Sequence, residues 1–156
     1  MTAVYPQAHP FAEGDLEEFL AQPLVAKLCT HNEDGSIHVA PIWFNNEDGE
    51  ILLGTQEVTQ KVHNIMRDSN VTVLVDKSDP PVKAVIVVGI AELDYEDAVA
   101  KRTAIFGKYI DNPAELAQNL ASSWTPVIIR VKPQSVTTFD YSQGFGIGSE
   151  SGQLDI

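Results

Sequence analysis

The sequence has a single cysteine, few basic residues and no long apolar run. One cysteine, Cys29, excludes an internal disulfide framework and is compatible with a reducing cytoplasm. The longest apolar stretch, residues 85–91, is far shorter than the roughly 20 residues that a helix needs to cross a bilayer. The first residues show neither the basic nor the apolar region of a secretory signal. We therefore expect a cytoplasmic protein with no membrane partner.

Basic residues are scarce relative to acidic ones. Ten Lys and Arg stand against 22 Asp and Glu, which gives a net charge of −12. No basic stripe is present that could displace counterions, so we expect no binding to nucleic acid. The histidines and the cysteine show no ligand spacing, so we expect no metal site. The chain also lacks a nucleophile elbow, a paired-carboxylate pattern and a triad, and no catalytic residue is assigned.

The composition is otherwise that of a globular chain. Hydrophobic residues make up 44% of the 156 residues. This length suits one domain with one hydrophobic core. We expect an irregular N-terminal arm over residues 1–14, a folded domain over 15–141 and a mobile glycine-rich tail over 142–156.

Turn residues separate short β-like runs. The tetrapeptide Asn-Glu-Asp-Gly occurs at residues 32–35 and again at 46–49, and Asp-Gly between such runs is a strong hairpin signal. Tight turns join most of the strands, which argues against a parallel sheet. We expect a mainly β fold with peripheral helices, as a small closed or split antiparallel barrel. The predicted strands are 24–31, 36–45 and 50–55, which form a meander, then 70–76, 82–93, 126–131 and 135–141. The predicted helices are 15–21, 59–68 and a region over 94–122 that breaks at Gly107 and at Asn112-Pro113.

The run 82–93 differs from the other predicted strands. Its apolar residues fall on both faces around residues 85–88. Such a pattern is typical of a strand that is buried on both sides, and we expect this of the run.

The segment from Gly54 to Lys61 follows a predicted strand and leads into a predicted helix. It offers two threonine hydroxyls, an amide, a lysine and the free N–H groups of a helix N-terminus. Such an end carries a partial positive charge and suits a phosphate group. The alternative is that Thr59 is only an N-cap and that Lys61 is a solvated side chain.

The segment from His38 to Phe44 is the second candidate. Pro41 cannot donate a ladder hydrogen bond, so it marks a sheet edge, a bulge or a place where another group meets the backbone. Trp43 and Phe44 are large apolar groups on opposite faces of the strand. One can fill the core, and the other needs a cover, which could be a ligand ring or a second subunit. The alternative is an ordinary core strand with one edge proline.

The order of these segments resembles the flavin-binding split-barrel superfamily related to pyridoxamine 5′-phosphate oxidase. The matching residues are 24–28, 34–44, 54–65 and 85–92, and the resemblance spans roughly residues 15–140. It implies a homodimer of six-stranded antiparallel split β-barrels with FMN at the subunit interface. In that family, flavin phosphate is held by the loop after the third strand, and a second-strand segment lays its backbone along the flavin ring.

The resemblance assigns residues one by one. For the phosphate they are Thr55, Thr59, Gln60 and Lys61, with Gln60 in place of the usual arginine; along the ring they are Ala40, Pro41, Ile42 and Trp43. The oxidase's residues that grip pyridoxamine phosphate have no counterpart, so true pyridoxamine 5′-phosphate oxidase activity is not expected. We expect an FMN-binding oxidoreductase that acts on a small-molecule substrate. The alternatives are the deazaflavin F420 in place of FMN, and a carrier of flavin, F420 or haem without turnover.

Overall fold

The computed structural model describes residues 9–142. Residues 1–8 of the predicted arm and 143–156 of the predicted tail lie outside this part. The elements in chain order are α1 (Asp15–Leu20), β1 (Ala26–His31), β2 (Ile37–Ile42), β3 (Phe44–Glu47), β4 (Glu50–Gln56), α2 (Gln60–Arg67), β5 (Asn70–Lys77), β6 (Lys83–Asp94), α3 (Ala98–Gly107), α4 (Pro113–Leu120) and β7 (Pro126–Asp140).

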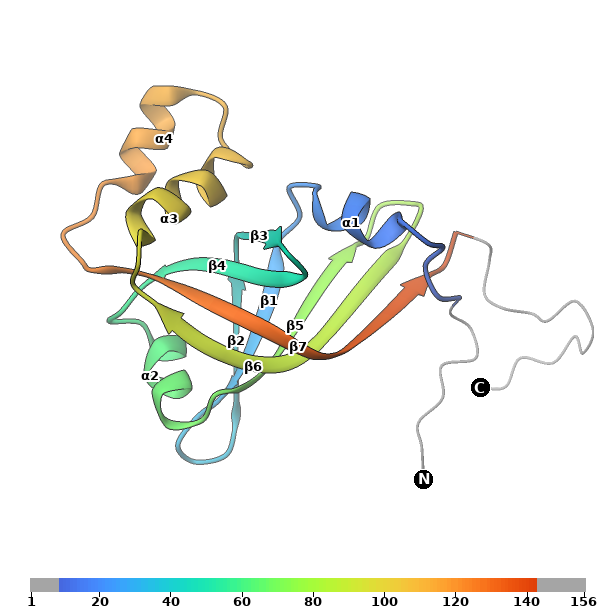
Figure 1. Cartoon of the computed structure of the whole chain (residues 1–156), viewed down its shortest axis with the longest axis horizontal. Coiled ribbons are helices and arrows are strands. Elements are labelled where there is room, and N and C mark those ends of the chain that lie inside the picture. The colour runs from blue at the N-terminus through green and yellow to red at the C-terminus, as the bar shows by residue number, and fades with distance from the viewer. Residues whose placement is uncertain (1–8, 143–156) are drawn as a thin grey trace, which may run out of the picture.

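The strands form one antiparallel sheet with the order β2-β1-β5-β6-β7-β4-β3 (Figure 1). β2 and β3 follow each other in the chain but lie at the two ends of this order. The sheet must therefore curl until its two edge strands meet at Trp43, the residue between them. This arrangement confirms the predicted mainly β fold, an antiparallel split barrel with peripheral helices.

The predicted strand 36–45 is divided into β2 and β3, and the sheet has seven strands where the resemblance implies six. β2 pairs with β1 and β3 pairs with β4, so the simple meander is wrong. At the break the Phe44 N–H donates to the Tyr109 hydroxyl at 3.2 Å, and that hydroxyl donates to the Leu24 carbonyl at 2.6 Å. A tyrosine thus satisfies backbone groups that a ladder would otherwise pair. Conversely, the predicted strands 126–131 and 135–141 join as one strand, β7.

The core lies inside the curled sheet. β6 contributes the buried Val85, Val87 and Ala91, while Val88 on the opposite face is 40% exposed. The expectation that this strand is buried on both faces is therefore wrong for the single chain. Facing residues from the other strands complete the core, and those with no exposed surface include Leu28, Phe44, Leu53, Val73 and Val131.

The helices lie around the ends of the sheet, with α3 and α4 together above one end and α2 below it (Figure 1). α3 packs Ala98 and Ile105 against Leu52 of β4 and Ile128 of β7. The predicted breaks are confirmed, because α3 ends at Gly107 and Asn112 caps α4 by accepting two backbone N–H bonds at 3.0 Å. None of the helices described is long and apolar enough to cross a membrane.

Candidate functional site

The two sequence segments singled out above meet at one cavity. It has a volume of about 420 Å³ and opens where the β2–β3 break faces the end of β4 and the start of α2. The two segments thus line the same cavity. The lining residues are Val25, Pro41, Ile42, Trp43, Gly54, Thr55, Lys61 and Phe106.

Trp43 forms the aromatic wall of the cavity. Its indole stacks on Tyr109, with ring centroids 4.7 Å apart and planes 6° apart, and meets the edge of Phe106 at 5.0 Å. The sequence predicted that one of Trp43 and Phe44 would fill the core and that the other would need a cover, such as a ligand ring or a second subunit. In the structure Phe44 is in the core, and Phe106 of α3 and Tyr109 just after it contact Trp43 from the same chain. Burial raises the pKa of the Tyr109 phenol, which keeps the hydroxyl protonated as a donor.

Gly54 allows α3 to approach this part of β4 closely. A Cβ atom at this position would lie 3.3 Å from Cγ of Arg102 and 3.4 Å from Cδ1 of Ile105. The Arg102 guanidinium is in turn 4.6 Å from the centroid of the Phe106 ring. A larger residue at position 54 would push away the helix that carries the aromatic wall.

Thr55 and Lys61 form the polar wall. Thr55 is 8% exposed, and its hydroxyl has no hydrogen-bond partner among residues 9–142. Lys61 is half-buried, and within the same residues it makes neither a hydrogen bond nor an ion pair. Burial lowers the pKa of the Lys61 ammonium, in keeping with a cation that has no ion-pair partner in residues 9–142. An unpaired cation next to a free hydroxyl is suited to an anionic group.

Thr59 and Gln60 lie at the start of α2, next to the cavity but outside its lining. The Thr59 hydroxyl donates to the Gln56 carbonyl at 2.9 Å, and no side chain caps the helix. The first-turn N–H groups are therefore left without a side-chain acceptor, and that turn contains no acidic residue. The Gln60 amide donates to Oδ1 of Asn64 at 2.9 Å, so this side chain is turned along its own helix.

Of the eight residues predicted for the cofactor, five line the cavity and three do not. Ala40 is buried and is absent from the lining, as are Thr59 and Gln60. Of the other lining residues, Gly54 was named only as the start of the candidate loop, and Val25 and Phe106 were missed. For Phe106 the sequence did contain a signal. Phe106 and Tyr109 are three residues apart in a region that was interpreted only as peripheral helix.

No metal centre is evident in the part of the chain that the structure describes. No three His, Cys, Asp or Glu side chains there lie close enough together to hold an ion. Among residues 9–142, neither a carboxylate nor a histidine lines the cavity. Its described residues can bind and orient a molecule, and Lys61 and Thr55 are the ones with a polar side chain.

The chain is similar to a known protein family and to several solved structures. Residues 12–140 match the family model described as pyridoxamine 5′-phosphate oxidase. No curated protein matches the chain. Similar solved structures include the conserved hypothetical protein Rv2991 from Mycobacterium tuberculosis, at 22% identity and a TM-score of 0.73 over 90% of this chain and 91% of that one.

Two further similar structures are of proteins whose descriptions state a function. A protein described as F420 reductase is 26% identical, with a TM-score of 0.65 over 81% of this chain and 98% of that one. The haem storage protein HutZ from Vibrio cholerae is 14% identical, with a TM-score of 0.63 over 83% and 97%. The family match covers every helix and strand described, from α1 to β7. The chain therefore belongs to the pyridoxamine 5′-phosphate oxidase family of flavin-binding split barrels.

Proposed function

We propose that the chain is an FMN-dependent oxidoreductase and that FMN binds in the 420 Å³ cavity. The observation that carries this proposal is the pairing of two unlike walls. One wall holds the unpaired Lys61 ammonium, the free Thr55 hydroxyl and the uncapped start of α2. The other holds Pro41, Ile42 and Trp43, which are apolar. A phosphate and a flat, largely apolar ring system require these two surfaces.

The proposed roles follow from the two walls. Lys61 and Thr55 bind the phosphate with their side chains, and Thr59 and Gln60 contribute as the first residues of α2, whose N–H groups point outward. The backbone from Ala40 to Trp43 lies along the ring. FMN, when bound, supplies the electron transfer, while the protein supplies position and electrostatics. This proposal requires no catalytic side chain from the protein, because the electron transfer is assigned to FMN.

We test this proposal by adding FMN to the purified protein and recording its visible spectrum after removal of unbound flavin. We expect about one FMN per chain, with absorbance near 450 nm, and release of the bound cofactor allows its identification by mass. Reduction of the bound flavin by NADH or NADPH and reoxidation by an acceptor would establish turnover. A protein that retains no flavin under these conditions would refute the proposal.

The deazaflavin F420 is the second candidate cofactor. The likeness to the F420 reductase, at 26% identity over 98% of that protein, favours it. Equilibrium dialysis of the protein against an equimolar mixture of FMN and F420 separates the two, because one cofactor will be retained preferentially. Retention of F420 would keep the cavity as the site and replace FMN in the proposal.

We further propose that the protein is a homodimer. An apolar surface runs across the outer face of the four adjacent strands β2, β1, β5 and β6. Its residues are cross-strand neighbours: Val39 pairs with Cys29, Cys29 with Thr72, and Thr72 with Val88. Val39 is 55% exposed and Val88 is 40% exposed, and Ile37 beside them on β2 is 53% exposed. A surface of this kind on a single chain is typical of a protein interface. It adjoins Pro41, the next outward residue of β2 after Val39 and a member of the cavity lining.

Val39→Glu is expected to convert the dimer to a monomer, because the charge would be buried without a partner within the interface. Size-exclusion chromatography with light scattering measures the mass directly. Val99→Glu is the matched control, since Val99 is 69% exposed on α3, away from this surface. A dimer that survives Val39→Glu would place the interface elsewhere on the chain.

A further inference from the structure

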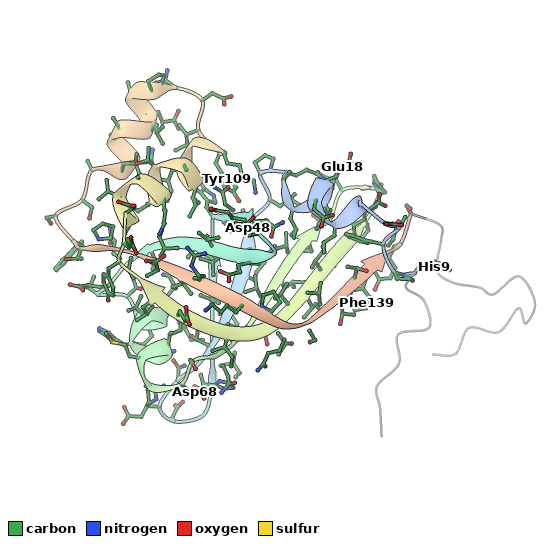
Figure 2. The ribbon with its side chains drawn as sticks, in the orientation of Figure 1. His9, Glu18, Asp48, Asp68, Tyr109 and Phe139 are labelled. Atoms are coloured by element: carbon green, nitrogen blue, oxygen red, sulfur yellow. The ribbon has the colours of Figure 1, made fainter. Side chains whose placement is uncertain are left out.

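A second and larger cavity lies between α1 and the sheet. Its volume is about 710 Å³, within the range of small-molecule sites. It is bordered by α1, by the β3–β4 hairpin and by inward positions of β6 and β7, and it shares no lining residue with the cavity of Lys61. In Figure 2, Asp48 of the hairpin is seen just below Tyr109 and to the left of α1, the helix that carries Glu18. The lining residues are Leu16, Glu17, Leu20, Ala21, Asn45, Asn46, Asp48, Gly49, Ile51, Val87, Lys108, Pro133 and Val136.

Lys108 is the cation of this cavity. Its ammonium donates to the carbonyls of Leu20 at 2.8 Å and Phe44 at 3.2 Å, and it lies 4.0 Å from the centroid of the Phe44 ring. An ammonium has three N–H donors, so one remains for a ligand. No carboxylate in residues 9–142 pairs with Lys108, although the chain has more than twice as many acidic as basic residues. Burial lowers its pKa to about 8, so the group is still mostly charged at neutral pH.

Four other polar side chains line the cavity without a partner. Asn45 and Asn46 are half-buried on β3, and Glu17 and Asp48 are exposed on α1 and on the hairpin turn. Within the described residues none of the four side chains makes a hydrogen bond or an ion pair. The amides can donate to a carboxylate, and the two carboxylates can accept from an ammonium. Amide donors and carboxylate acceptors are thus both available to a ligand in this cavity.

The floor of the cavity is apolar and incompletely covered. Leu20, Ile51 and Val87 are buried there, yet Val136, which pairs with Val87 across the β6–β7 ladder, is 44% exposed. An inward position on a barrel strand with that much exposure indicates that no side chain of the described part fills this space. The floor therefore suits an aliphatic group.

We propose that this cavity is a second ligand site that binds a free α-amino acid with an aliphatic side chain. The ligand carboxylate accepts from Lys108 and from the asparagine amides, its ammonium donates to Glu17 and Asp48, and its side chain lies on the floor formed by Ile51, Val87 and Val136. Each of the three parts of such a molecule meets one of the three kinds of group that line the cavity. The inference is independent of the flavin proposal, because it uses none of the same residues.

The test is a titration of the ¹⁵N-labelled full chain, followed by two-dimensional NMR, with three probes of similar length. L-norleucine carries both charges, hexanoate lacks the ammonium and pentylamine lacks the carboxylate. We expect saturable shifts of the Asn45 and Asn46 side-chain amides with norleucine. Each single-charge probe is expected to bind about tenfold or more weakly, because each loses charge-assisted hydrogen bonds.

Three variants localise the effect. Lys108→Met is expected to weaken norleucine binding about tenfold, while Lys101→Met, on the same helical segment but paired with Asp94 outside the cavity, leaves it unchanged. Val136→Phe fills the floor and abolishes binding without removing any polar group, so it also serves if Lys108→Met does not fold. No saturable shift up to about 10 mM norleucine, equal binding of all three probes, or unchanged binding in Val136→Phe would each overturn the proposal. Flavin retention, measured on the same samples by visible absorbance, reports separately on the other site.

Discussion

The double variant Thr55→Val, Lys61→Met is expected to bind FMN more weakly by about 2–4 kcal/mol, or about 30- to 1,000-fold. In the free protein neither side chain has a hydrogen-bond or ion-pair partner in residues 9–142, so their removal breaks no polar interaction within the described part. The loss falls on the complex alone, where both groups would hold the phosphate. Both replacements keep the approximate shape of the side chain, so the cavity should retain its form.

Fluorescence quenching of FMN on titration with protein measures this loss. Lys101→Met serves as the control for removal of one positive charge, because its ammonium is bound to Asp94 and not to the cavity. Gln60→Leu is informative as well. Its amide is engaged by Asn64, so we expect a change of less than about threefold. An unchanged FMN affinity in the double variant, with an intact fold by circular dichroism, would move the phosphate site away from Thr55 and Lys61.

Gly89→Ala is expected to destabilise the fold by about 3 kcal/mol or more. The register between β6 and β7 shifts between Val88 and Gly89, where the bulge brings the Lys132 backbone very close. A Cβ atom on Gly89 would lie 2.3 Å from the Lys132 carbonyl oxygen and 3.0 Å from its carbonyl carbon. Both contacts are with backbone, so no side-chain rotation can relieve them, and the two longest strands would have to separate locally.

Urea unfolding followed by circular dichroism gives the free energy of unfolding of this variant. Gly107→Ala is the matched control, since nothing lies within 4 Å of its Cβ position at the end of α3. The same substitution there is expected to be neutral or to stabilise by up to about 1 kcal/mol, because alanine favours a helix more than glycine does. Equal effects at the two positions would show that backbone freedom, rather than the close approach, decides the outcome at Gly89.

Local sequence signals predicted the turns and most of the strands. The two Asp-Gly turns are present, and Gly35 and Gly49 have φ of +84° and +79°, which favour glycine. The break at Trp43 could not be predicted in this way, because it depends on a tyrosine hydroxyl 65 residues further along the chain. The single long strand β7 likewise depends on its β6 partner, which accommodates Pro133 opposite the bulge at Gly89.

The candidate cavity was predictable to the extent that its residues follow one another in short segments. Thr55 and Lys61 stand at a strand end and a helix start, and Pro41 marks an unusual strand, so each carries a local signal. Val25 carries none and Phe106 carries only its spacing from Tyr109, because the packing of α3 and the start of β1 brings these two residues to the cavity. The role of Gln60 was obscured for a similar reason, since Asn64 and its buried neighbours decide where its amide points.

The place of β7 in the sheet has a consequence for how the protein is made. β7 is the last element in residues 9–142, yet it lies between β6 and β4 and pairs with both. Before residues 126–140 leave the ribosome, the chain can form only a β2-β1-β5-β6 sheet and a separate β3–β4 hairpin. Pro41 belongs to the first unit and Thr55 to the second, so we expect a nascent chain to become able to hold a ligand in this cavity only after its final strand has been synthesised.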